Sequence, residues 1–203
     1  MVLEQRIYHL THIRNLPGIV SDHALVAGAT PVLDIAPAAL RSERAETGVS
    51  ASGKTLNEYV PFFLSPDATF WQALRDGNEH PRLSREALSS ETSDFVFLVS
   101  TLRHVVSAAH DFVVTDGNAE GSYTRFAMTR DDAEGLLHRL RSENAGAGLL
   151  EAELLVEGAL PLESVTLVGV QNDKVRAAVR EILRESDFTP KISVYPPWFQ
   201  VAD

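Results

Sequence analysis

The chain has 203 residues, which is enough for one compact domain with a several-stranded sheet and a hydrophobic core. It contains no cysteine, and this excludes disulfide bonds, thiolate catalysis and cysteine-ligated zinc or iron–sulfur centres. The formal net charge is -10, whereas proteins that hold nucleic acid mainly by neutralising phosphates are usually basic, so general electrostatic binding to nucleic acid is disfavoured.

The first part of the chain predicts a strand at residues 6–11 and a short helix near residues 15–18. Side chains in this strand alternate, so that Ile7, His9 and Thr11 share one face. The polar members of that face are therefore available to bind a ligand.

The rest of the chain continues as a mixture of strands and helices. Further strands are expected at residues 58–64, 95–99, 112–115, 151–156, 164–170 and 191–195. Pro61 cannot donate a backbone hydrogen bond, so its strand is expected at a sheet edge or a bulge. Helices are expected at residues 37–46, after the capping residue Thr129, and at 173–185. Residues 142–148 are expected to form a flexible loop. The pattern predicts a single α+β domain over residues 1–203, with a mixed sheet flanked by helices.

Two carboxylates stand two residues apart where the strand at 151–156 begins. If Glu151 and Glu153 both lie in the strand, their side chains project from the same face. One carboxylate would then stabilise a developing cation while the other orients an acceptor, as glycosyl-transfer chemistry requires. The alternative is a solvent-facing acidic edge with Ala152 and Leu154 turned inward, and spacing alone favours that alternative.

Histidine and arginine side chains supply two further candidates. His9 and Thr11 can hydrogen-bond a ribose or an amide from one face of the first strand. Arg44, in the second predicted helix, can bind a diphosphate through two parallel hydrogen bonds. Local sequence favours plainer interpretations, a structural histidine and a surface ion pair of Arg44 with Glu43 or Glu46. The histidines lack partners at metal-ligand spacing, so no metal site is expected.

Motifs and segments that the chain lacks narrow the class of protein further. Its sequence has no G-x-G-x-x-G and no G-x-S-x-G, which disfavours a Rossmann dehydrogenase and an α/β-hydrolase. The first residues lack the apolar stretch of a secretion signal, and no run approaches the roughly 20 apolar residues of a membrane helix. We expect a cytoplasmic protein that does not bind a membrane.

Several short segments form an ordered set along the chain. They are Ile7-Tyr8-His9-Leu10-Thr11-His12-Ile13-Arg14-Asn15-Leu16, Tyr59-Val60-Pro61-Phe62-Phe63, Val96-Phe97-Leu98-Val99-Ser100, Thr115-Asp116-Gly117-Asn118-Ala119, Thr124-Arg125-Phe126, Glu151-Ala152-Glu153-Leu154-Leu155-Val156 and Val194-Tyr195-Pro196-Pro197-Trp198-Phe199. This ordered set resembles the DarT family, toxins that attach ADP-ribose to bases of single-stranded DNA. The resemblance covers nearly the whole chain.

The resemblance implies an ADP-ribosyltransferase fold, which is a split mixed sheet with NAD in a cleft between its halves. By position, the residues that bind NAD would be His9, Leu10, Thr11, Arg44 and Tyr59. Glu153 matches the catalytic glutamate of the family, and Arg44 matches the arginine placed near NAD and the target base. Glu151 would contact the acceptor.

The implied activity is transfer of ADP-ribose from NAD, as co-substrate and without a metal, to bases of single-stranded DNA, with thymidine as the default acceptor. A macrodomain-type antitoxin is the other implied partner. Three features depart from the family pattern: Glu151 in place of glutamine, the run at residues 144–150 without basic residues, and residues 65–68 in place of an Arg-Ser-Pro-like turn. They leave open an ADP-ribosyltransferase that modifies protein arginine or RNA, and a non-catalytic relative that binds NAD or nucleic acid.

Overall fold

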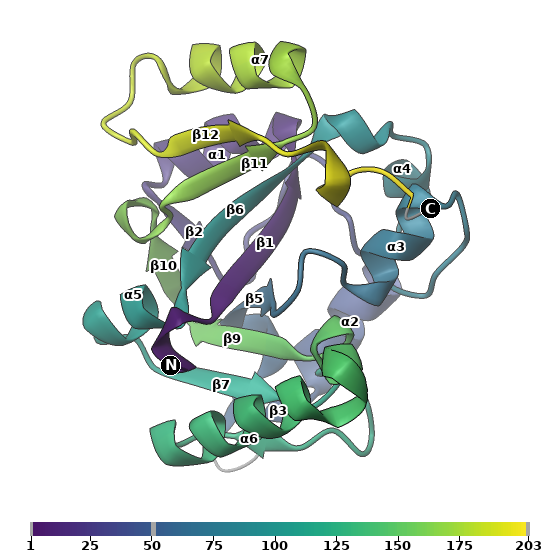
Figure 1. Ribbon diagram of the computed structural model, residues 1–203, viewed down its shortest axis with the longest axis vertical. Helices are drawn as coiled ribbons and strands as arrows, with labels where there is room; N and C mark the ends of the chain where they lie inside the picture. The colour runs from purple at the N-terminus through teal and green to yellow at the C-terminus, as the bar shows by residue number, and fades with distance from the viewer. Residues whose placement is uncertain (1, 50–51, 202–203) are drawn as a thin grey trace.

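The computed structural model describes residues 2–49 and 52–201, and its main element is an eight-stranded sheet (Figure 1). The strands stand in the order β12 (Lys191–Val194), β11 (Leu167–Val170), β6 (Phe95–Thr101), β1 (Arg6–His12), β5 (Tyr59–Phe63), β9 (Glu153–Glu157), β7 (Phe112–Thr115) and β8 (Phe126–Ala127). Neighbouring strands are antiparallel except β11 and β12, which are parallel. The predicted mixed sheet of an α+β fold is confirmed.

Helices and two small sheets surround the main sheet. The helices are α1 (Leu16–Ser21), α2 (Ala38–Glu46), α3 (Thr69–Arg75), α4 (Arg85–Leu88), α5 (Leu102–Ser107), α6 (Arg130–Ser142) and α7 (Asp173–Leu183). The small sheets pair β2 (Ala24–Val26) with β10 (Ala159–Pro161), and β3 (Gly48–Val49) with β4 (Lys54–Thr55). In Figure 1, α7 lies against β12 at the top and α6 lies against β7 at the bottom. Within the described residues, no helix is long and apolar enough to cross a lipid bilayer.

The centre of the sheet is buried on both faces, as the continuous apolar run at residues 95–99 predicts. All six residues from Phe95 to Ser100 are buried. The apolar stripe of α7 joins the hydrophobic core on one face. On the other face, Trp71 and Trp198 pack edge-on against Phe97. The sheet is therefore held firmly at β6, beside the strand β1 that carries the first candidate residues.

The sheet is split between β1 and β5. β1 pairs with β6 at seven positions and β5 pairs with β9 at five, but β1 and β5 pair only at Tyr8 and Phe63. The N–H and C=O of one strand residue point the same way, so the missing N–H of Pro61 faces the split, where no ladder bond is needed. Its carbonyl oxygen accepts a hydrogen bond from His9 Nδ1 at 3.0 Å across the gap. Pro61 therefore lies at an internal edge of the sheet, which explains how a proline fits into an interior strand.

Three predicted boundaries are wrong near β9 and β11. Residues 143–150 form a 3-10 helix rather than a flexible loop, and Gly148 packs so closely that a Cβ would lie 2.7 Å from Leu140 Cδ2. The turn of this helix runs on through residue 151, so β9 begins at Glu153. β11 begins at Leu167 because residues 162–164 form another 3-10 turn. Small residues in the first segment allow close packing on α6, which local sequence cannot distinguish from flexibility.

Candidate functional site

Glu153 is the first residue of β9 and is anchored by its backbone. Its N–H donates to Thr115 Oγ1 at 2.9 Å, and the Thr115 hydroxyl donates to the carbonyl of Gly117 at 2.7 Å. The start of β9 is thereby tied to the loop that follows β7. The side chain of Glu153 is 0% exposed, so the alternative of a solvent-facing acidic edge is wrong.

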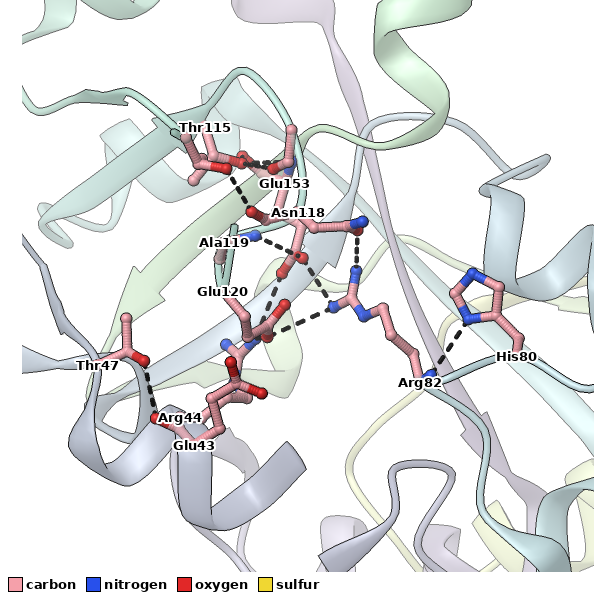
Figure 2. A network of polar contacts seen from close by, with 12 residues as sticks. Glu43, Arg44, Thr47, His80, Arg82, Thr115, Asn118, Ala119, Glu120 and Glu153 are labelled. Carbon is pink, nitrogen blue, oxygen red and sulfur yellow. Dashed lines mark hydrogen bonds and ion pairs between the residues drawn. The ribbon is translucent and has the colours of Figure 1, made fainter. Parts of the chain in front are cut away.

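Two arginines and a second glutamate surround the Glu153 carboxylate (Figure 2). Arg82 Nη2 lies 2.7 Å from Glu153 Oε1, and Arg44 Nη1 lies 3.6 Å from Oε2. Glu120 forms an ion pair with Arg44, and its Oε1 lies 3.8 Å from Arg82 Nη2. The backbone N–H of Ala119 donates to Glu153 Oε1 at 3.3 Å. The two arginines and the two glutamates carry equal and opposite charge, so the cluster is neutral overall and can be almost completely buried.

The position of Arg82 is fixed from several sides. Its Nη1 donates to Asn118 Oδ1 at 2.7 Å, and its guanidinium carbon lies 5.5 Å from the ring centre of Phe63 and 5.7 Å from that of Phe70. These are hydrogen-bond and cation–π contacts to three different elements or loops. Arg82 therefore holds Glu153 in one orientation.

The cluster also sets the protonation of its members. Burial alone would raise the pKa of Glu120, but Arg82 and Arg44 outweigh it and hold that pKa below its ordinary value. Burial alone would lower the pKa of Arg82, but Glu153 and Glu120 outweigh it and raise that pKa. At neutral pH Glu120 is therefore an anion and Arg82 a cation.

Two atoms of the cluster are left with unused hydrogen-bonding capacity. Glu153 Oε2 and Arg44 Nη2 are buried and have no hydrogen-bond partner among the described residues. An unsatisfied buried polar group costs about 1–3 kcal/mol. Both atoms are therefore suited to binding a ligand that supplies the missing partners.

A cavity of about 310 Å³ lies beside this cluster. Its lining includes predicted NAD-binding residues, namely His9, Leu10, Thr11, Arg44 and Tyr59, together with Arg82. Glu153 contacts the two arginines that line it. The structure thus brings the β1 candidates and the α2 arginine together around one cavity, and the β9 glutamate lies next to two of the arginines that line it.

His9 and Thr11 present defined hydrogen-bonding groups to the cavity. Because Nδ1 of His9 donates to Pro61, its Nε2 is an acceptor when the ring is neutral. Burial lowers the pKa of His9 below its ordinary value of 6.5, and the hydrogen bond to Pro61 only partly opposes this, so the ring is neutral at pH 7. Asn15 Nδ2 donates to Thr11 Oγ1 at 3.1 Å, which leaves the Thr11 hydroxyl proton for a ligand.

Two predictions about charged candidates are corrected by the geometry. Glu151 is half-buried in a turn with φ -110° and ψ -22°, outside β9, so the prediction that it shares a strand face with Glu153 is wrong. Arg44 is only 9% exposed and pairs with Glu120 and Glu153, so the surface pair with Glu43 or Glu46 is wrong as well.

Sequence reasoning missed Arg82, Glu120 and the Ala119 N–H. Arg82 stands in a polar loop between α3 and α4 that has no periodic pattern. Ala119 ends the segment at residues 115–119, whose resemblance to the DarT family was the one available signal. Among the described residues, no three His, Asp or Glu side chains are grouped as a metal ion would require.

A split mixed sheet with a buried glutamate beside a cleft lined by histidine, threonine and arginine is the arrangement of an NAD-dependent ADP-ribosyltransferase. The sequence profile of the family described as "ssDNA thymidine ADP-ribosyltransferase, DarT" matches residues 8–200. The chain belongs to this family.

Known relatives are similar over nearly the whole chain. It is 26% identical over 202 residues to a DNA ADP-ribosyl transferase of Thermus aquaticus, covering 95% of this chain and 88% of that protein. The DarT of Thermus sp. 2.9 in complex with ADP-ribosylated ssDNA has a TM-score of 0.80 at 26% identity, covering 97% of this chain and 96% of that chain. The same DarT in complex with NAD+ has a TM-score of 0.77 at 26% identity, covering 97% and 98%. The predicted fold, family and enzyme class are confirmed.

Proposed function

We propose that this chain transfers ADP-ribose from NAD+ to thymidine in single-stranded DNA, with Glu153 stabilising the reacting ribose. The observation that carries the proposal is the fully buried carboxylate of Glu153, whose Oε2 has no hydrogen-bond partner among the described residues. A ribose hydroxyl would supply the missing donor. The family to which the chain belongs supports thymidine as the acceptor.

We assign NAD+ to the cavity lined by His9, Leu10, Thr11, Tyr59 and Arg44. Nε2 of His9 accepts and the Thr11 hydroxyl donates, which suits an amide or a ribose hydroxyl. Leu10 and Tyr59 supply apolar wall, and Arg44 supplies positive charge beside the diphosphate. The NAD+ complex of the Thermus sp. 2.9 relative supports NAD+ as the co-substrate.

In the proposed reaction, the bond between C1′ of the ribose and the nicotinamide nitrogen breaks. Nicotinamide leaves as a neutral molecule with the bonding electron pair, and the ribose becomes oxocarbenium-like. A carboxylate beside it binds this cationic state more strongly than the ground state and so lowers the barrier. Arg82 and the Ala119 N–H fix Oε1 of Glu153, and Oε2 remains for the sugar.

The acceptor must lose a proton as the new bond forms. Thymidine has one ring N–H, at N3, so the new bond joins C1′ to N3. An arginine guanidinium carries its full complement of protons in proteins and cannot take that proton. We therefore assign Arg44 to polarise the base, and we assign the ionised Glu120, which binds the same guanidinium, to accept the proton.

A DNA acceptor is favoured over a protein arginine. Glu151 in place of the family's glutamine left a protein arginine open as the acceptor, but Glu151 lies in a turn outside β9 and does not share a strand face with Glu153. The Glu151 charge nevertheless acts on Arg82, so we keep it as a residue that adjusts acceptor binding.

We place this activity in one domain over residues 1–203, in the cytoplasm and without a metal. NAD+ and DNA occur together in that compartment. Because ADP-ribose on DNA would harm the cell that makes the enzyme, we propose that a macrodomain-type antitoxin is its partner.

Two oligonucleotides that differ only in carrying one thymidine or one cytidine test the proposed function. We expect the protein to transfer one ADP-ribose from NAD+ to the thymidine oligonucleotide alone, as measured by the intact mass of the oligonucleotide. One nicotinamide should be released per transfer. An RNA of the same sequence and an arginine-rich protein run in parallel. Labelling of either of these without labelling of DNA would contradict the proposal.

A further inference from the structure

A second hollow, of about 510 Å³, lies on the main sheet away from the NAD+ cavity. Arg6 and Lys191 are exposed at this hollow, and Tyr195 beside them is 47% exposed. Within the part of the chain that the structure describes, neither cation forms an ion pair with a carboxylate. Two uncompensated cations beside an exposed aromatic ring are the combination that binds single-stranded nucleic acid. The whole protein has a net charge of -10, so these two cations form a local positive patch on an acidic surface.

The register of the sheet connects this hollow to Glu153. Residues directly opposite each other on neighbouring strands have their side chains on the same face. One such row crosses the sheet through Glu153, Phe63, Tyr8, Val99, Leu167 and Lys191. Figure 1 shows the strands of this row from β9 below to β12 at the top. The last four residues line the hollow, so it opens on the face of the sheet that carries Glu153.

Strand spacing gives the length of this row. At about 4.8 Å per strand, Tyr8 lies about 10 Å from Glu153 along the row, and Lys191 lies about 24 Å away. A stacked single strand advances about 3.4 Å per nucleotide, so the row matches about seven nucleotides, or fewer if the strand is extended. An acceptor base at Glu153 is therefore close enough for the same strand to reach the hollow.

We propose that the hollow holds the single-stranded DNA on one side of the acceptor thymidine, with Arg6 and Lys191 at phosphates and Tyr195 against a base. This inference rests on the proposed function, because it needs an acceptor base at Glu153. Charge supports DNA as the occupant, because the nearby carboxylate would not repel its phosphates. Asp67, the carboxylate that acts on Tyr8 in the hollow, is paired with Arg75 at 3.0 Å.

Long and short oligonucleotides with one thymidine separate this surface from the acceptor site. The long one carries six or so further nucleotides on each side, and the short one carries about one, so only the long strand can reach the hollow. In the wild-type protein we expect a higher kcat/KM for the long oligonucleotide. In Arg6→Gln/Lys191→Gln the ratio of kcat/KM for the long oligonucleotide to kcat/KM for the short one should fall to about one. The factor by which the double variant lowers this ratio should be about sevenfold larger at about 50 mM than at about 200 mM salt. Each phosphate contact on a single strand contributes a slope of about -0.7 to the logarithm of affinity against the logarithm of salt concentration, and the variant loses two such contacts.

Two controls make the result specific. Lys174→Gln/Arg180→Gln removes two exposed cations from α7, which packs on the opposite face of the sheet, and should keep the wild-type ratio. Tyr195→Ala should lower the ratio about fivefold or more while Tyr195→Phe preserves it, because the ring and not the hydroxyl stacks on a base. An Arg6→Gln/Lys191→Gln protein with the wild-type ratio and salt slope would overturn the inference, although the proposed function would stand. Absence of transfer to either oligonucleotide by the wild-type protein would overturn both.

Discussion

The four buried charges around Glu153 are predicted to act as one unit, and Arg82→Gln tests this. The change removes the cation that lies 2.7 Å from Glu153 and 3.8 Å from Glu120, and it leaves Arg44 alone against two carboxylates. Removing one partner of a buried ion pair costs about 3–5 kcal/mol. At about 2–4 °C per kcal/mol for a chain of this size, the variant should melt about 6–20 °C below the wild-type protein.

Adding Glu120→Gln to Arg82→Gln restores the balance, because one arginine then faces one ionised carboxylate. The double variant should be about 1–3 kcal/mol more stable than the sum of the two single effects predicts. Urea unfolding of the four proteins, followed by circular dichroism, measures this difference. Arg130→Gln, which breaks an exposed pair with Glu134 at 3.3 Å, is the control and should cost less than about 1 kcal/mol. Single effects that add to within about 0.5 kcal/mol would refute the reasoning.

NAD+ at about 100 times its Kd should stabilise the protein by about 2.7 kcal/mol in thermal melting, and His9→Ala should lose most of this; an undiminished shift would argue against NAD+ in the β1 cavity. Because burial lowers the pKa of His9 below 6.5, KM for NAD+ should stay level down to pH 6.5 and rise only in more acid solution, whereas a rise beginning above pH 7 would contradict a neutral His9. Arg44→Lys keeps a cation beside Glu120 but loses the planar guanidinium with its paired N–H donors, so transfer to DNA should fall about tenfold. A wild-type rate would show that Arg44 does not act on the acceptor base. Glu151→Gln should leave the free energy of unfolding within about 0.5 kcal/mol and raise transfer to single-stranded DNA, and unchanged transfer would show that Glu151 does not affect the acceptor.

Elements with strong periodicity were predictable from the sequence. The alternation at residues 6–11 and the apolar run at 95–99 correspond to β1 and β6, and the helices at α2 and α7 begin within a residue of their predicted starts. The same reasoning placed the start of β9 two residues early. Whether residue 151 continues a turn or begins a strand depends on how the 3-10 helix packs on α6, and that contact is tertiary.

The site was only partly predictable, because its charges come from distant parts of the chain. The sequence singled out His9, Arg44 and Glu153, which the structure places in or beside one cavity. The burial of Arg44 was not predictable, since its partners are Glu120 and Glu153 rather than its helical neighbours. Arg82 lies in a loop where no local rule distinguishes a buried arginine from a solvated one. Its role follows only from the contact with Glu153 that the fold creates.

We propose that the Glu153 carboxylate accelerates ADP-ribose transfer. Glu153→Gln keeps the size of the side chain and is preferable to alanine, because a buried cavity beside Arg82 and Arg44 would also disturb folding. The most direct measurement is the single-turnover rate of ADP-ribose transfer to a thymidine oligonucleotide, with Glu151→Gln as the matched control two residues away. We expect Glu153→Gln to lose about 100- to 1000-fold in rate, equivalent to about 3–4 kcal/mol, while it still melts cooperatively and is stabilised by NAD+. A folded Glu153→Gln protein that transfers ADP-ribose at close to the wild-type rate would contradict the account.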